Sequence, residues 1–178
     1  MALKRKDFAD YLNVSKTQEA SYVLLGYGVE SLDEEPGAQT DTTCYINDET
    51  SSTTITKYET QFPYTSEIII EQEAIKSLYL TGRNHETGTD AERDYVRVDM
   101  FDPVSDSAGT YNARKFRVAN EVSTFSGEGG EKMKVEGTLH AIGDPIQGTF
   151  NVTTKTFTPT TTQTSNTCLL YTSPSPRD

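Results

Sequence analysis

Apolar and polar residues alternate with a period of two through residues 111–157, in three consecutive segments. Glycine-rich residues 126–130 separate the first two segments, and a Gly-Asp-Pro turn at residues 143–145 separates the second from the third. The apolar positions are Phe116, Val118 and Val122 in the first segment, Val135, Gly137 and Leu139 in the second, and Ile146, Phe150 and Val152 in the third. Such alternation is typical of antiparallel strands that bury one face. The sequence therefore predicts a core β-meander over residues 111–157.

The alternation also constrains the register, because a slip by one residue would turn each apolar set toward water. For the first hairpin we predict that Glu121 lies opposite Lys134. The neighbouring register would set Glu121 against Glu136, a like-charge pair that costs about a few tenths of a kcal/mol. For the second hairpin we predict that Phe150 lies opposite Gly137, so that the aromatic ring covers a residue without a side chain.

Three further segments have the character of strands. Residues 22–25 form a short apolar run, residues 52–64 are rich in β-branched and aromatic side chains, and residues 95–100 alternate. Residues 1–20 are polar with few apolar side chains, and we expect them to form an N-terminal arm outside the core.

The period changes over residues 67–81. Apolar residues recur there at helical spacing, at Ile68, Ile75, Leu78 and Tyr79. Thr65 and Ser66 are candidate N-caps, and Gly82 is a candidate stop. This pattern predicts one α-helix, at about residues 67–81, that packs on the sheet through its apolar stripe.

Residues 28–43 are acidic and carry the Pro, Gly and Asp residues typical of a long loop. No Lys or Arg occurs between Thr17 and Thr56. The plain interpretation is a solvated loop, and the functional one is an acidic surface that meets a partner or faces a polyanion. The candidate residues of that surface are Glu30, Asp33, Glu34, Glu35 and Asp41.

The totals narrow the class of protein. The chain has 178 residues, enough for one domain with a core, and ten Tyr and seven Phe offset a hydrophobic content of only 34%. A net charge of −11 disfavours binding to DNA or to anionic membranes. No apolar run approaches the roughly eighteen residues that a membrane span requires, and the N-terminus lacks the apolar region of a secretory signal.

Catalytic and metal-binding constellations are absent from the sequence. His85 falls in a polar loop and His140 on the solvent-facing parity of a strand, and neither has a Cys or His neighbour at metal-ligand spacing. Cys44 stands in no nucleophile motif. The glycines of residues 127–130 lie in a hairpin turn and open no helix, which disfavours a phosphate cradle. We expect no enzyme activity, no metal and no cofactor.

The last eleven residues, 168–178, break with the Thr-rich segment before them. Read back into codons, they match in one frame a transposase-based sequencing adapter at every residue. We interpret this segment as translated adapter, so that the native sequence ends by Thr167 and Cys44 is the only native cysteine.

Three runs carry a resemblance to a known family. Residues 22–48, the passage around residues 58–64, and residues 126–150 resemble the major tail protein (tail tube protein) of long-tailed bacteriophages and Gram-positive prophages, and the similarity spans residues 8–158. The resemblance implies a mainly β fold, an antiparallel β-sandwich or barrel with one flanking α-helix, in a single tail-tube domain over residues 1–167. It implies no catalytic residues.

The resemblance also implies a function. Tail tube proteins self-assemble into six-fold rings that stack into a hollow tube for DNA delivery. The partners would be copies of the chain and the tape-measure, tail-terminator and distal tail proteins, with DNA passing through without specific binding. The chain would be made in the bacterial host cytoplasm and reside in the virion tail.

From the residues, an acidic conduit would repel phosphate and let DNA slide. We therefore expect residues 28–43 to contact the adjacent ring, with some of their acidic side chains reaching the lumen. Three alternatives remain open at this point: the tube protein of a contractile secretion-like machine, an acidic β-sandwich surface-binding module, and a small β-barrel enzyme or ligand carrier.

Overall fold

The computed structural model describes residues 2–47 and 49–160. Its strands are β1 (Phe8–Asn13), β2 (Tyr22–Leu24), β3 (Val29–Leu32), β4 (Ala38–Thr43), β5 (Ser52–Tyr58), β6 (Gln61–Glu67), β7 (Glu92–Pro103), β8 (Thr110–Ser126), β9 (Lys134–Ala141), β10 (Ile146–Asn151) and β11 (Thr156–Pro159). The helices are α1 (Glu73–Arg83) and the short 3-10 turns η1 (Arg5–Asp7) and η2 (Gly88–Ala91). The predicted class, mainly antiparallel β with one flanking helix, is confirmed. The segment assigned to the adapter lies outside the described residues.

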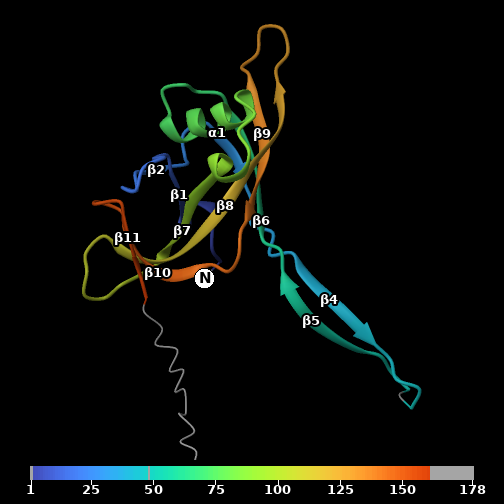
Figure 1. Ribbon diagram of the computed structural model, residues 1–178. Coiled ribbons are helices and arrows are strands. Elements are labelled where there is room, and N and C mark those ends of the chain that lie inside the picture. The colour runs from blue at the N-terminus through green and yellow to red at the C-terminus, as the bar shows by residue number, and fades with distance from the viewer. Residues whose placement is uncertain (1, 48, 161–178) are drawn as a thin grey trace, which may run out of the picture.

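Nine of the strands form one antiparallel sheet that curls into a half-barrel (Figure 1). Its main path runs in the order β2-β1-β7-β8-β9-β6-β3, and β10 and β11 branch from β8. Helix α1 packs against β8 at the upper end of the sheet. Strands β4 and β5 leave the sheet as a separate two-stranded hairpin.

Strand β8 organises the sheet because it is long enough to hold two partners on one edge. Its C-terminal half pairs with β9 and its N-terminal half pairs with β10. β9 and β10 therefore lie end to end along β8, and the Gly-Asp-Pro turn at residues 143–145 interrupts this line of pairing. The predicted meander is wrong at this point, because no pairing joins β9 to β10. β9 pairs instead with β6.

The predicted register of the first hairpin is also wrong. Glu121 lies opposite Thr138, and Lys134 lies opposite Ser126 near the hairpin loop. A β-bulge at Ser123 shifts the pairing between these two points. A bulge changes the parity of a strand within one hairpin, so an alternation rule that assumes a continuous ladder cannot give the register across it.

Aromatic cover of the strand glycines is present, but with different partners from those predicted. Gly137 lies beside Tyr64 of β6, whose hydroxyl would be 2.7 Å from a Cβ at position 137. Gly148 lies beside Phe157 of β11, whose ring would be 2.5 Å from a Cβ at position 148. The predicted pairing of Phe150 with Gly137 is wrong because Phe150 lies opposite Tyr111 and Phe157.

The core has two parts, one on each face of β7. The first part lies under α1, and its largest buried side chains are Leu12, Phe62, Leu78, Tyr95, Phe116 and Leu139. The second part lies on the opposite face, and its members are Tyr11, Tyr22, Val96, Val98, Ala113 and Phe150. The inward parity predicted for Phe116, Val118, Val135, Leu139 and Phe150 is confirmed. Burying each such large side chain contributes about 1.5–3 kcal/mol.

Three expectations from the sequence are corrected: the start of the helix, its stop, and the N-terminal segment. Helix α1 begins at Glu73 with Gln72 as its N-cap, because Thr65 and Ser66 pair with β9 as part of β6. Gly82 lies inside the last turn, where a Cβ would be 2.7 Å from Val122, so it permits close packing on β8. At the N-terminus, residues 1–20 were expected to lie outside the core, but they contain β1, which lies between β2 and β7.

Candidate assembly interface

The β4–β5 hairpin, called the arm below, projects from the core as a ribbon (Figure 1). Its ladder continues that of β3 and β6, since the pairs Leu32–Tyr64, Glu35–Gln61 and Ala38–Tyr58 keep one register. The long loop expected at residues 28–43 is therefore wrong: the segment consists of β3, a short connection and β4. Sequence alternation missed β4 because every one of its residues is exposed, so neither face carries a burial signal.

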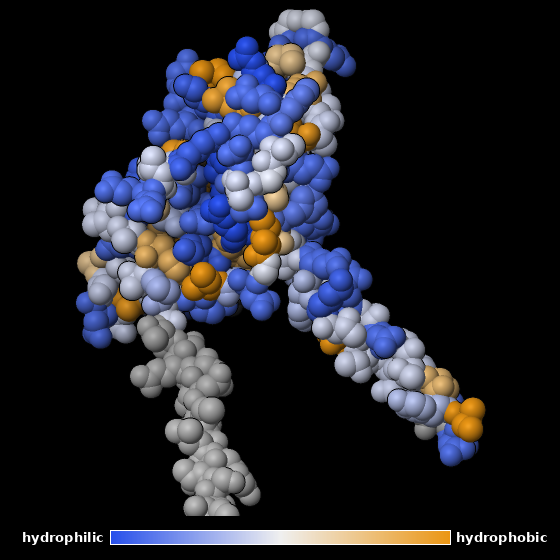
Figure 2. All heavy atoms as spheres, in the orientation of Figure 1, coloured by the Kyte–Doolittle hydropathy of each residue, from blue (hydrophilic) through white to orange (hydrophobic). Residues whose placement is uncertain are grey.

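The arm exposes groups that are unusual on the surface of a single chain. Ile46 at the tip and Ile55 on β5 are exposed apolar side chains, and Tyr58 on β5 is exposed as well. Figure 2 shows hydrophobic residues on the surface at the tip of the arm and along it. The two outer backbone edges of the hairpin have no strand beside them among the described residues. An isolated two-stranded hairpin is marginally stable in water, and open edges invite pairing with another chain. The arm is thus the best candidate for a surface that becomes covered on assembly.

A glycine marks the joint between arm and core. Gly37 has a φ of +63°, and a Cβ there would collide with the carbonyl oxygen of Glu59. The amide of Glu59 donates to the carbonyl oxygen of Gly37 at 3.0 Å, so the two strands approach closely at this point. Position 37 therefore requires glycine on both conformational and steric grounds.

Replacing Gly37 with alanine should loosen the joint. The left-handed backbone alone costs a residue with a Cβ about 1–2 kcal/mol. We expect the amides of Glu59 and Gln61 to exchange hydrogen about ten-fold faster or more, since about 1.4 kcal/mol corresponds to a factor of ten. Gly129→Ala is the matched control, because a Cβ there meets no atom within 4 Å. Equal exchange rates in both variants would contradict the assignment.

The structure separates the five acidic candidates predicted from the sequence. Glu30 forms an exposed ion pair with Lys134 at 2.7 Å, and Glu35 accepts a hydrogen bond from the side-chain amide of Gln61 at 2.7 Å. Asp33 is exposed on the connection that leads to the arm, and Asp41 is exposed on β4. The fifth residue, Glu34, is turned toward the core.

Glu34 is held by two arginines from the middle of the sheet. Arg114 of β8 donates to both carboxylate oxygens, at 2.7 and 2.9 Å, and Arg97 of β7 donates at 2.9 Å. Burial would raise the pKa of the Glu34 carboxyl, but the hydrogen bonds from Arg114 and Arg97 outweigh it and hold the pKa below its usual value. Glu34 is therefore a charged link between the connection and the core.

Behind this link lies a buried carboxylate. Asp10 of β1 is 1% exposed and accepts a hydrogen bond from Arg97 Nε at 2.9 Å. The Tyr95 hydroxyl also donates to Asp10, and Arg5 pairs with it from the surface. Neither Asp10 nor Arg97 stands out in the sequence as a candidate. The signal in the sequence was Arg97, a charged residue within the otherwise apolar run 95–98. Alternation places its side chain in solvent only if one face of this strand is solvated.

The lowered pKa of Glu34 predicts a pH dependence with a definite sign. A carboxyl whose folded pKa lies below its unfolded value of about 4.3 stabilises the fold above that pH, and loses this contribution as the pH falls through the folded pKa. We expect the free energy of unfolding of the wild type to exceed that of Glu34→Gln at pH 7, with the difference shrinking toward pH 3. Urea titrations across that range provide the measurement, and a constant difference would contradict it.

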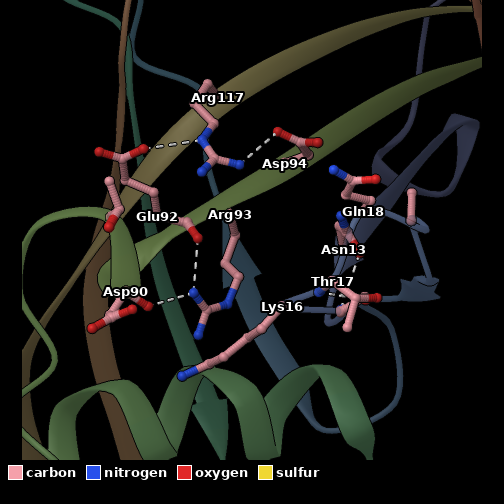
Figure 3. Close-up of a pocket in the computed structure, with 12 residues that line it drawn as sticks. Asn13, Lys16, Thr17, Gln18, Asp90, Glu92, Arg93, Asp94 and Arg117 are labelled. Carbon is pink, nitrogen blue, oxygen red and sulfur yellow. Dashed lines mark hydrogen bonds and ion pairs between the residues drawn. The ribbon is translucent and has the colours of Figure 1, made fainter.

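The pocket in Figure 3 is lined by charged side chains that pair within the chain. It has a volume of about 350 Å³, and its guanidinium groups are occupied by neighbours. Arg93 donates to the carbonyl oxygens of Asp90 and Glu92, and Arg117 pairs with Glu92 and Asp94. Within residues 2–47 and 49–160, no group of three His, Cys, Asp or Glu is placed to hold a metal ion.

The remaining sequence candidates are scattered. His140 lies on β9 against Glu121 at 2.5 Å, His85 lies in the loop after α1, and Cys44 is exposed next to the end of β4. These three side chains therefore come from separate parts of the fold: a strand of the main sheet, the loop after α1, and the arm. Among the described helices, none is long and apolar enough to cross a membrane.

Comparison with known proteins places the fold. No family model matches the sequence, and no curated protein matches it. A chain of the SPP1 tail tube superposes with a TM-score of 0.61 and 13% identity, over 82% of this chain and 78% of that chain. A chain from the tail of the empty GTA particle, a structure with C6 symmetry, superposes with a TM-score of 0.56 and 8% identity, over 81% and 97% of the two chains.

These similarities confirm the resemblance drawn from the sequence at the level of the fold. The curled antiparallel sheet with one flanking helix is the fold of phage tail tube proteins. A chain of the anti-feeding prophage baseplate superposes with a TM-score of only 0.43, and we draw no conclusion from it.

Proposed function

We propose that this chain is a non-enzymatic structural protein that assembles with copies of itself into the tube of a phage tail. The observation that carries the proposal is the arm: a ribbon exposed on both faces, on a fold shared with a chain of the SPP1 tail tube and a chain of the GTA tail. A neighbouring copy would cover the open edges and the exposed apolar side chains of this ribbon.

The assembly we propose is a ring of six copies, stacked into a hollow tube. The C6 symmetry of the GTA tail supports six-fold rings. A ring requires a head-to-tail interface that closes, and a tube requires a second interface between rings. The edges of β2 and β3, which end the main path of the sheet, are available for the first, and the arm is available for the second.

We also propose that DNA passes through this tube without specific binding. The chain carries a net charge of −11, and an acidic wall repels phosphate. Asp33 and Asp41 remain the best candidates for the lumen or the ring contact, because both are exposed, whereas Glu34 is bound within the chain. Glu30 and Glu35 are also candidates for the lumen or the ring contact. Each already has a partner within the chain, and a neighbouring copy would have to displace that partner.

The location and partners follow from the same role. The chain would be made in the bacterial host cytoplasm and reside in the virion tail, with the tape-measure, tail-terminator and distal tail proteins as neighbours. The tail tube fold and the exposed arm support this placement.

Electron microscopy of the purified chain tests the proposal. Residues 1–167 would be expressed, concentrated and imaged in negative stain across a range of salt concentrations. Hollow tubes or rings with six-fold averages are the expected result. A chain that stays monomeric by sedimentation under every condition, with a folded circular dichroism spectrum, would overturn it.

A further inference from the structure

The arm has one attachment to the core through its backbone. There, the ladder of β3 and β6 continues into β4 and β5 past the joint at Gly37, and the carbonyl oxygen of Thr60 accepts from the amide of Ala141 at the end of β9 at 2.9 Å. Two-stranded ribbons twist over a wider range than strands inside a sheet, so this ladder alone defines the direction of the arm only loosely. A defined direction requires a second attachment from another part of the molecule.

Glu34 supplies that second attachment. It lies three residues before Gly37, and both of its carboxylate oxygens are occupied by Arg97 and Arg114. These arginines stand on β7 and β8, whereas β3 pairs with β6 at the far end of the strand order. The hydrogen bonds from Arg97 and Arg114 to Glu34 therefore cross the interior of the curled sheet. They hold the segment between β3 and β4 against β7 and β8 on the opposite side.

The receiving side of this contact is itself held in place. Arg97 donates to buried Asp10 at 2.9 Å and to the carbonyl oxygen of Leu32 at 3.2 Å. The guanidinium of Arg114 lies 5.6 Å from the ring centroid of Phe116. Because each arginine has partners besides Glu34, the carboxylate meets groups that are already oriented.

We propose that Glu34 is the positioning residue that fixes the direction in which the arm leaves the core. The inference rests on the proposed function in one respect, namely that the arm must reach a defined place on a neighbouring copy. A six-residue strand spans about 20 Å, so a change of about 20° moves its tip by about 7 Å, more than the spacing of about 4.8 Å between paired strands. Such an error would misplace the tip on its neighbour.

The experiment measures the direction of the arm in the full chain. A spin label at Cys44, which is exposed near the arm tip, and another at Lys76→Cys on the exposed side of α1 report one distance, with Cys168→Ser to avoid a third label. We expect Glu34→Gln to widen the distance distribution at least two-fold and to lower tube yield. Glu67→Gln is the matched control, since Glu67 lies at the end of β6 away from the arm and pairs with Lys132 in the loop between β8 and β9.

An unchanged distribution in Glu34→Gln would overturn the inference while leaving the tube function intact. If the unsubstituted chain forms no tubes, the function fails, and the monomer distances still decide the role of Glu34. If Glu34→Gln does not fold, Arg114→Met decides instead, because it removes two of the three hydrogen bonds to Glu34 and keeps an apolar side chain over Phe116. A narrow distribution in folded Arg114→Met would then overturn the inference.

Discussion

Deleting the arm abolishes tube formation and leaves a folded core: this is the first result we expect. The deletion replaces residues 38–58 with Asn-Gly, a dipeptide that favours the tight turn of a two-residue hairpin. Gly37 and Glu59 already lie side by side, joined by the hydrogen bond between them, so the shortened ladder closes without strain at its ends. All residues of β4 and β5 are exposed, so the core loses no buried side chain.

Two measurements separate folding from assembly in this variant. Thermal unfolding should shift by less than about 5 °C, which corresponds to about 1–2 kcal/mol for a domain of this size. Tube yield, measured by pelleting and electron microscopy, should fall by more than ten-fold. A smaller change, Ile46→Ser, removes only the apolar side chain at the tip and should give an intermediate yield. Normal tubes from the shortened chain would show that the arm has no part in the interface between rings.

The sequence predicted which side chains face the core better than it predicted which strands are neighbours. Alternation placed Phe116, Val118, Val135 and Leu139 inward, because a strand with one solvated face must alternate. It gave no information about the partner of each strand. β9 and β10 share one edge of β8 because β8 is seventeen residues long, and nothing in the apolar pattern of residues 134–151 distinguishes this from a meander.

The candidate site was predicted as a region but not as a set of contacts. Residues 28–43 were singled out for their charge, and part of this segment builds the arm and its joint. Glu34 and Glu35 are adjacent and identical in type, yet one is bound by two core arginines and the other lies at the surface. Their difference arises from the curl of the sheet, which brings β3 across from β7 and β8, and a long-range closure of this kind leaves no local pattern.

The second large effect we expect is at Asp10, which neutralises the arginine behind the arm. Asp10→Ala removes the acceptor of Arg97 Nε and of the Tyr95 hydroxyl, and both donors are buried. Removing one partner of a buried ion pair costs about 3–5 kcal/mol. Arg97 keeps its pair with Glu34 at 2.9 Å, so we expect the lower end of that range. At about 2–4 °C per kcal/mol, the midpoint of thermal unfolding should fall by about 10 °C.

Asp94→Ala provides the matched control for this substitution. Asp94 pairs with Arg117 at 3.1 Å, and both side chains are partly exposed, a setting in which ion pairs contribute at most about 1 kcal/mol. Asp10→Asn keeps an oxygen acceptor without the charge, so its loss should lie between the two alanine variants. If Asp10→Ala lowers the free energy of unfolding no more than Asp94→Ala does, Arg97 must gain water or another acceptor when Asp10 is removed. Glu34 would then rest on a mobile side chain, and the arm would lose the rigid wall that fixes its direction.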